Sequence, residues 1–412
     1  MLPTRFDAHC HVFNLEYLLL EAADMLFHEI LGQYPHSTAK TLTEADSDTD
    51  RSPQSQLQRI KGFITWLKDL IDACRDSEEE NLNTVLGAAR AGWNDGRPVS
   101  SIPLMMDIYY MFAPILPQGP APVEAESRAE SMPFDDAVKQ LESLLQELKI
   151  PAEHVELIRQ KITENKNVKA LDTVSYFDTW GFAHHRKALK ALKAARPNDL
   201  YPFFAVDPRR PGVVDAVISG NIVGKDRSFQ GVKLYPRLGY HPACAALDPL
   251  FRWCSENHIP IITHCGPGGF PPDNFTPPDH DQLGLPANFD PVLERYPNLI
   301  IDFAHFGSSC TAWAEEVADR IEKYENVYSD LACYTVDHRI PNFKAAFWNR
   351  PKVQERTMFG TDFDVFYFTA VSITLEKYYS FFKAASNPGA FTDAELIGLS
   401  STVPEQFLSS VR

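Results

Sequence analysis

The closely spaced histidines near the start of the chain are the residues most suited to chemistry. His9 and His11 lie two residues apart in the segment Phe6-Asp7-Ala8-His9-Cys10-His11. Side chains alternate across a β-strand, so both imidazoles would project from one face and Cys10 from the other. Histidine is a frequent metal ligand, but an isolated pair is more often structural. The pair therefore indicates a metal site only if other segments supply further ligands.

Later strand-like segments do end in residues that could complete such a site. These residues are Lys233, His264, His305 and Asp362. Imidazole and carboxylate form the usual ligand set of a catalytic zinc-type ion, which keeps one coordination position open for water. Unrelated structural histidines have no reason to recur at the ends of successive strands. Their order along the chain therefore predicts one shared site.

The elements that must position these residues are eight predicted strands. They are Arg5–His11, Ile102–Met111, Tyr201–Val206, Gly231–Tyr235, Pro260–His264, Leu299–His305, Val327–Leu331 and Thr357–Asp362. Helix candidates alternate with the later strands, at Ala183–Ala195, Leu250–Asn257, Ala312–Glu325 and Tyr367–Ala384. This alternation is typical of a parallel sheet covered by helices, and eight strands close a barrel. We expect an α/β fold, a TIM (β/α)8 barrel with its active site at the carboxyl ends of the strands.

Two helical insertions are predicted in the first part of the chain, at about 14–100 and 114–175. The first carries an apolar stripe at helical spacing, at Leu57, Ile60, Ile64, Leu67 and Ile71, and the second carries one at Ala137, Leu141, Leu144, Leu145 and Leu148. Both stripes are interpreted as packing surface. The insertions would cover the barrel mouth or form a dimer surface, within a single domain over residues 1–412.

Composition narrows the class of protein. The 412 residues include 39 Lys and Arg against 55 Asp and Glu, a net charge of -16 that argues against a nucleic-acid surface. Seven cysteines without paired spacing favour reduced thiols. We find no signal sequence and no apolar run long enough to span a bilayer, so we expect a cytoplasmic protein with no membrane partner. Its expected partner is a small-molecule substrate, and a homo-oligomer is left open.

The histidine pair and the later ligands resemble the amidohydrolase superfamily, specifically the amidohydrolase-related group that includes metal-dependent hydrolases and aminocarboxymuconate semialdehyde decarboxylase. The resemblance rests on the His-x-His opening and the Gly360-Thr361-Asp362 ending, and it extends from Asp7 to Asp362 without explaining the insertions. It implies that a divalent metal is bound by His9, His11, His264 and Asp362. Zinc is the preferred ion, although manganese and iron accept the same ligands.

The resemblance leaves two residues with alternative roles. His305 would lie beside the metal as a catalytic residue or bind a second ion. Lys233 falls on the fourth predicted strand, where some superfamily members carry a carboxylated lysine that bridges two metals. The other interpretation pairs its ammonium with a nearby carboxylate. A single-metal site is common in the amidohydrolase-related group, so we favour one ion.

The chemistry expected of this site is metal-assisted addition of water. Asp362 would accept the proton of the water, and His305 would orient or polarise the substrate oxygen. Tyr235 and Arg237 are candidates for substrate binding, because they closely follow Lys233. The preferred function is hydrolysis of an amide, ester or lactone-like bond. A decarboxylase on the same barrel is the alternative, with Arg237 as the candidate for holding a substrate carboxylate, and a catalytically silent binding barrel is the third.

Overall fold

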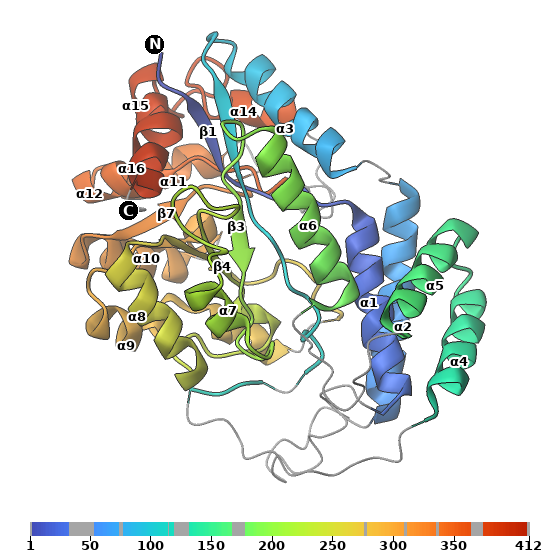
Figure 1. Ribbon diagram of the computed structural model, residues 1–412. Helices are drawn as coiled ribbons and strands as arrows, with labels where there is room; N and C mark the ends of the chain where they lie inside the picture. The colour runs from blue at the N-terminus through green and yellow to red at the C-terminus, as the bar shows by residue number, and fades with distance from the viewer. Residues whose placement is uncertain are drawn as a thin grey trace.

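The computed structural model describes residues 2–32, 53–73, 77–113, 115–118, 132–166, 178–275, 278–308, 311–334, 338–363 and 374–409. Strands and helices alternate in one part of the molecule, and a group of helices that includes α1, α2, α4 and α5 lies to one side of it (Figure 1).

The strands of the first part form a parallel barrel. They are β1 (Arg5–Cys10), β2 (Val99–Pro103), β3 (Phe203–Ala205), β4 (Gly231–Leu234), β5 (Ile261–Thr263), β6 (Ile301–Phe303), β7 (Val327–Asp330) and β8 (Thr357–Met358). Strands β3 to β8 pair in sequence order, and β1 pairs with β2. A bridge between Leu104 and Phe203 joins the second strand to the third, and the Ala8 amide donates to the Phe359 carbonyl at 2.8 Å. The predicted TIM barrel is confirmed.

The second strand is where the prediction of strand boundaries was most wrong. Strand β2 begins at Val99 and ends at Pro103, whereas 102–111 was predicted. Residues 106–113 leave the sheet, and their apolar side chains pack into a cluster with the inserted helices, where Ile108 and Tyr109 are fully buried. An apolar run buried under inserted helices has the same composition as a buried strand, so the sequence pattern does not separate the two.

Helices cover the outside of the barrel. They are α6 (Trp180–Ala195), α7 (Val213–Ser219), α8 (Asp248–Asn257), α9 (Asp290–Arg295), α10 (Thr311–Lys323), α11 (Arg339–Phe347), α12 (Pro351–Arg356), α14 (Leu375–Phe381), α15 (Asp393–Ile397) and α16 (Val403–Ser409). The helices predicted after the second, fourth and sixth strands are confirmed as α6, α8 and α10, with ends that differ by a few residues. The predicted helix 367–384 is shorter, since α14 begins at Leu375, and residues 364–373 lie outside the described residues.

The last helix closes the barrel near the amino ends of the strands. The ring of Phe407 in α16 stacks on Phe203, the first residue of β3, with centroids 6.0 Å apart. Phe407 also contacts Tyr328 of β7 at 5.2 Å and belongs to an apolar cluster that includes Ile102 and Ile262. The amino end of the barrel is therefore filled with apolar side chains, which leaves the carboxyl ends for a site.

The inserted helices are α1 (Leu15–Ile30), α2 (Pro53–Ala73) and α3 (Glu78–Trp93) before β2, and α4 (Phe134–Glu147) and α5 (Ala152–Lys166) after it. Helix α1 packs against α2, α4, α5 and α6. The described side chains of both predicted stripes pack into this core, with Ile64 of α2 and Leu141 of α4 fully buried, and the side chain of Ile71 lies outside the described residues. The single-domain organisation stays a prediction.

A buried ionic network ties α1 to the barrel. The guanidinium of Arg210, which follows β3, donates to both oxygens of Asp107 at 2.7 and 2.6 Å and to Glu21 of α1 at 3.1 Å. The other oxygen of Glu21 accepts from the backbone amides of Gly181 and Phe182 at 2.8 and 3.0 Å, in the first turn of α6. Every member is buried, so the network fixes α1 at one position relative to the barrel.

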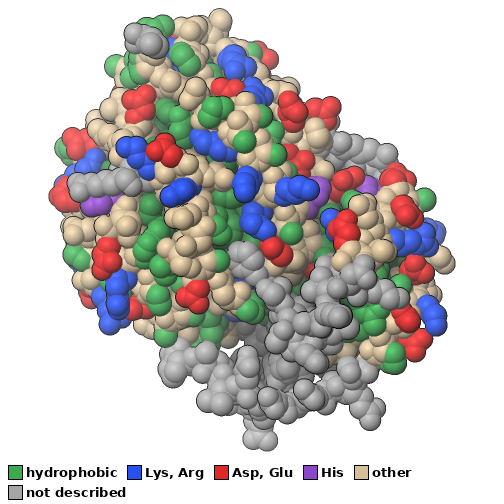
Figure 2. Space-filling view, viewed as in Figure 1, with side chains coloured by type: hydrophobic (Ala, Val, Ile, Leu, Met, Phe, Trp, Pro, Cys, Tyr) green, Lys and Arg blue, Asp and Glu red, His purple; other side chains and the backbone are tan. Residues whose placement is uncertain are grey.

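The surface carries charges of both signs. Lys, Arg, Asp and Glu side chains are interspersed over the face shown in Figure 2. No helix of the described residues is long and apolar enough to cross a membrane.

Candidate metal centre and active site

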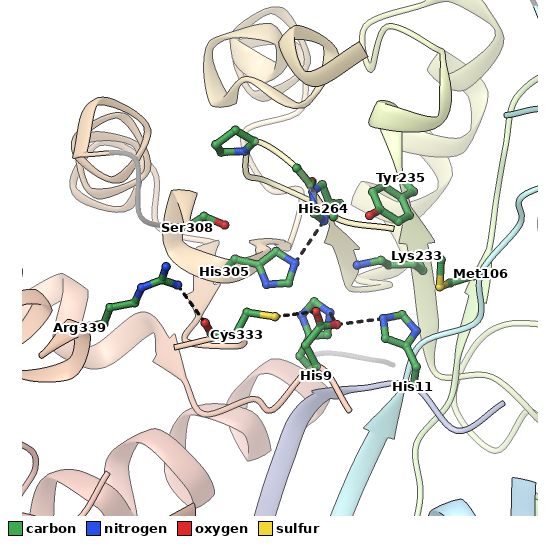
Figure 3. Close-up of a pocket in the computed structure, with 14 residues that line it drawn as sticks. His9, His11, Met106, Lys233, Tyr235, His264, His305, Ser308, Cys333 and Arg339 are labelled. Atoms are coloured by element: carbon green, nitrogen blue, oxygen red, sulfur yellow. Dashed lines mark hydrogen bonds and ion pairs between the residues drawn. The ribbon is translucent and has the colours of Figure 1, made fainter. Parts of the chain in front are cut away.

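The carboxyl ends of the strands meet at a pocket of about 190 Å³. Its lining includes all the residues predicted as ligands or catalytic groups, namely His9, His11, Lys233, His264, His305 and Asp362. The labelled side chains of the four histidines and Lys233 point toward one another from different strands and strand ends (Figure 3). The structure therefore brings together residues that are separated by more than 350 positions in the chain.

Hydrogen bonds at Nδ1 determine the tautomers of His9 and His11. Nδ1 of His9 lies 2.7 Å from Oδ2 of Asp330, and Nδ1 of His11 lies 2.8 Å from the carbonyl oxygen of Leu104. Both partners are acceptors, so the ring proton of each neutral imidazole resides on Nδ1. The Nε2 lone pairs then face the pocket, at 3.3 Å for His9 and 3.2 Å for His11 from Oδ1 of Asp362.

Three acceptor atoms thus converge on one point, which is unfavourable unless a cation lies among them. Around a tetrahedral ion with bonds of 2.0–2.1 Å, neighbouring ligand atoms are about 3.3–3.4 Å apart. The measured separations of 3.2 and 3.3 Å match that value. Nε2 of His9 is also buried with no hydrogen-bond partner among the described residues. These residues fit a divalent metal.

The second pair of histidines lies on the other side of the pocket. Nε2 of His264 lies 3.2 Å from the Gly266 carbonyl oxygen and 3.1 Å from that of Gly268, so the ring proton is placed on Nε2. Nδ1 of His264 faces Nε2 of His305 at 3.2 Å. Burial lowers the pKa of His264 well below its usual value and that of His305 to about 4. Both rings are therefore neutral at pH 7 and have a lone pair available.

One compact group of potential ligand atoms differs from the predicted ligand set. Potential ligand atoms of His9, His305 and Asp362 all lie within 4.8 Å of one another. His11 joins this cluster through Asp362, and His264 joins it through His305. The assignment of single residues as ligands stays a prediction, and His305 belongs to this group together with two of the residues predicted to bind the ion.

Asp330 supports the site and was missed in the sequence. Besides the His9 imidazole, it accepts the backbone amides of His305 and Ala332, both at 2.9 Å from Oδ1. Although its burial raises the pKa of Asp330, the neighbouring His9 outweighs it and holds the pKa well below the usual value. The available signal was a carboxylate at the end of a predicted strand, the same signal that identified Asp362.

The turn that carries Asp362 is held by a buried carboxylate of the first strand. Asp7 accepts the amide of Thr361 at 3.0 Å, its hydroxyl at 2.6 Å, and the hydroxyl of Tyr379 at 2.8 Å. The amide of Asp362 donates to the His9 carbonyl at 2.7 Å. A Cβ on Gly360 would lie 2.7 Å from Cβ of His9, so only glycine allows this approach. These contacts fix Asp362 next to the histidine pair.

Backbone strain is concentrated at the same strand ends. His305, Cys333 and Asp362 follow β6, β7 and β8, and their φ angles are 65°, 62° and 61°. Positive φ costs a non-glycine residue about 1–3 kcal/mol when the surroundings impose it, and such residues cluster at functional sites. Three residues with positive φ around one pocket therefore indicate a functional site.

Lys233 projects into the pocket from β4 as a buried amine. No described residue forms a hydrogen bond or ion pair with its ammonium group, so the carboxylate partner considered for it is not found among them. Burial lowers the pKa of Lys233 to about 8, although Asp362 and Asp330 act in the opposite direction. A donor in this state is available to a substrate oxygen.

The two predicted substrate-binding residues have different positions. Tyr235 lines the pocket, and its hydroxyl accepts the amide of Phe270 at 3.0 Å. Arg237 does not line it. The guanidinium of Arg237 donates to Asp281 at 2.6 Å, to Asp273 at 2.5 Å and to the Pro271 carbonyl at 2.7 Å.

The substrate-binding role predicted for Arg237 stays a prediction, although its guanidinium contacts Asp281 and Asp273 and is not part of the pocket lining. Its position only a few residues after Lys233 suggested the pocket, but the chain turns in a short helix at Pro236–Leu238 and directs the side chain to the loop after β5. Arg237 holds that loop, part of which covers the site.

Two further pocket residues were not identified in the sequence. The thiol of Cys333 donates to Oδ2 of Asp362 at 2.9 Å, and Nη1 of Arg339 donates to the Cys333 carbonyl at 3.2 Å (Figure 3). Both belong to the segment after β7, for which the sequence analysis predicted no site residue. The thiol is kept protonated, since burial raises the pKa of Cys333 well above its usual value.

Comparisons with solved structures show distant likeness. An uncharacterised TIM-barrel protein from Bordetella bronchiseptica is 19% identical with a TM-score of 0.41, over 55% of this chain and 72% of that one. 2,6-Dihydroxybenzoate decarboxylase from Rhizobium is 12% identical at 0.40, over 55% and 76%. 4-Oxalomesaconate hydratase from Rhodopseudomonas palustris is 13% identical at 0.40, over 67% and 89%. These likenesses are too distant to indicate a reaction.

No curated protein matches the chain. The amidohydrolase family matches residues 178–402, which include Lys233, His264, His305 and Asp362 but not the first histidine pair. Members of this family use divalent metals. Because the match spans more than half of the 412 residues, the chain belongs to the amidohydrolase family and is an enzyme of the amidohydrolase superfamily.

Proposed function

We propose that the protein is a metal-dependent hydrolase that cleaves an amide, ester or lactone-like bond of a small molecule. The observation that carries the proposal is the convergence of the His9 and His11 lone pairs on the Asp362 carboxylate. One divalent ion, preferably zinc, is proposed to be held by these three residues and by His264 through Nδ1. When bound, such an ion lowers the pKa of water and polarises a carbonyl oxygen.

The other catalytic roles are proposed for side chains of the pocket. Asp362, the single carboxylate among the described residues that line the pocket, is proposed to take a proton from the attacking water. The Cys333 thiol holds Oδ2 of that carboxylate in place. Lys233 is positioned to donate to the oxygen on which negative charge develops, and His305 to orient it.

Activity of a carboxylate variant tests this proposal. We expect Asp362→Asn to reduce kcat by about 10²- to 10⁴-fold, the usual contribution of a positioned base. The assay uses metal-reconstituted protein and a panel of small esters, lactones and amides. Asp248→Asn in α8 is the matched control, since Asp248 pairs with Arg295 on the outer surface. Equal activity of Asp362→Asn and wild type would exclude the proposed base.

A decarboxylase on the same barrel is the second candidate. It is favoured by the cation at Arg339, which lines the pocket and could hold a substrate carboxylate. Release of carbon dioxide from an acid substrate, measured in a closed vessel, separates the two functions. Hydrolysis without carbon dioxide release supports the first, and the reverse supports the second.

A further inference from the structure

Arg339 lines the pocket and has no carboxylate partner among the described residues. It begins α11, and no carboxylate of the described residues forms an ion pair with it. Arg339 is half-buried, and the four buried arginines of the described residues are all paired, Arg5 with Asp95, Arg210 with Asp107, Arg237 with Asp281 and Arg320 with Asp290. The single hydrogen bond from Nη1 to the Cys333 carbonyl orients the guanidinium and leaves other donors to meet a ligand.

Lys233 provides an independent sign that the pocket receives an anion. The residue has a relative exposure of 3%, no described carboxylate forms an ion pair with its ammonium group, and Nζ lies 5.7 Å from the centroid of the Tyr235 ring. Asp362 is the single carboxylate among the described residues that line the pocket, and the two histidines of β1 already surround it. The pocket has two cations without a carboxylate partner among the described residues, in a chain of net charge -16, and this favours an anionic ligand.

The positions of the two cations separate their roles. Lys233 comes from β4 and Arg339 from the segment after β7, and they approach His305 from opposite sides (Figure 3). An anionic group at Arg339 would therefore place the rest of the molecule across His305 and Asp362. A planar guanidinium binds a carboxylate through two parallel hydrogen bonds, which fixes orientation as well as position.

We infer that Arg339 binds a carboxylate group of the substrate and so restricts the enzyme to small carboxylic acids. The inference rests on the proposed function, because it assumes that the reaction takes place in this pocket. It applies to a hydrolase, in which the carboxylate is retained, and to a lyase alike. Arg339 thereby takes the specificity role that the sequence suggested for Arg237.

Binding of a matched acid and amide tests the inference. Benzoate and benzamide are titrated calorimetrically into the full chain after chelator treatment, so that a carboxylate cannot be bound by metal. We expect wild type to bind benzoate at least about tenfold more tightly than benzamide. Arg339→Gln should weaken benzoate by about 10- to 100-fold, the range expected for a hydrogen-bonded charge, and leave benzamide unchanged.

Two further variants serve as controls. Arg339→Lys retains the charge and should recover part of the benzoate affinity. Arg227→Gln removes the same charge from an exposed residue before β4 and should bind benzoate like wild type. The melting temperature of each variant shows that it is folded.

Several outcomes overturn the inference. They are absence of benzoate binding by wild type, equal binding of benzoate and benzamide, and unchanged benzoate affinity in folded Arg339→Gln. Because the titration uses metal-free protein, it is independent of turnover. Weakened benzoate binding in Arg339→Gln without metal-dependent activity in wild type would reject the proposed function alone.

Discussion

Two hydrogen bonds decide what the first histidine pair can do. Asp330 and the Leu104 carbonyl each take the Nδ1 proton of one imidazole, and this leaves both Nε2 lone pairs facing Asp362. Protein metal sites commonly use such an acceptor behind a ligating histidine, because it fixes the tautomer and increases the basicity of the ligand. The metal-binding capacity of the pocket therefore depends on residues that do not touch the ion.

Removal of the charge behind His9 tests this dependence. We expect Asp330→Asn to weaken divalent metal binding by about 10- to 100-fold, since the ring loses the carboxylate that orients it. Competition with a fluorescent chelator measures the affinity. The surface variant Asp248→Asn should bind metal like wild type, and an unchanged affinity in Asp330→Asn would show that the tautomer is not set by Asp330.

Two neighbouring glycines give a second test at the level of single residues. A Cβ at Gly269 would lie 2.5 Å from the Tyr235 hydroxyl and 3.1 Å from Cε1 of His264, whereas a Cβ at Gly268 would meet nothing within 4 Å. Both have positive φ, at 126° and 74°, so both alanine variants carry backbone strain.

Only Gly269→Ala should therefore displace His264 and Tyr235. We expect it to reduce kcat/KM by at least about tenfold relative to Gly268→Ala, because misplacement by about 1 Å can cost 10²-fold. Steady-state kinetics on both variants measures the difference. Equal loss in both would mean that strain in the loop, not contact with the site, controls activity.

The strands position the site by bringing their carboxyl ends together. Alternation and apolar runs in the sequence predicted these strands, and the residues directly after them identified His264, His305 and Asp362. Arg339 was not predicted, because it is the first residue of α11 and does not lie at the end of a strand. Arg237 follows Lys233 closely in the sequence, but the chain turns at Pro236–Leu238 and the guanidinium contacts Asp281 in the loop after β5.

The insertions were predicted from helical periodicity, but their connection to the barrel was not. That connection depends on Arg210, Glu21 and Asp107, which are separated in sequence and come together only when α1 lies against α6 and the strand ends. A single sequence does not indicate which charged residues at distant positions form ion pairs with one another.

The buried network predicts a large effect of one substitution. Arg210→Met leaves the carboxylates of Glu21 and Asp107 buried without their cation, and we expect it to lower the free energy of unfolding by about 3–5 kcal/mol. Chemical denaturation measures this change. Arg252→Met, at an exposed ion pair with Asp248, should change it by less than about 1 kcal/mol. A small effect of Arg210→Met would show that the network contributes little to stability.

In the whole molecule, the insertions extend to the loop that covers the site. Phe63 and Trp66 of α2 contact Phe275 with ring centroids 5.4 and 5.7 Å apart, and Trp66 contacts Phe270 at 5.8 Å. Phe270 directly follows Gly269, and its amide donates to the Tyr235 hydroxyl. The insertion therefore supports one wall of the pocket, in keeping with the expectation that it covers the barrel mouth.

The family match covers the later strands of the barrel but not the first strand, which carries His9 and His11. The match begins at residue 178, after the insertions, and the first histidine pair is joined to it by the contacts of β1 with the Gly360-Thr361-Asp362 turn. The central claim is that these two parts together form one metal site.

Metal content measures this claim most directly. Protein purified without added metal or chelator is analysed by elemental mass spectrometry, together with a folded His9→Ala/His11→Ala variant. We predict one divalent ion per wild-type chain and its loss from the variant. Two ions per chain would favour a carboxylated Lys233 with a ligating His305. A wild type that holds no ion even after reconstitution, or a variant that retains its ion, would contradict the account.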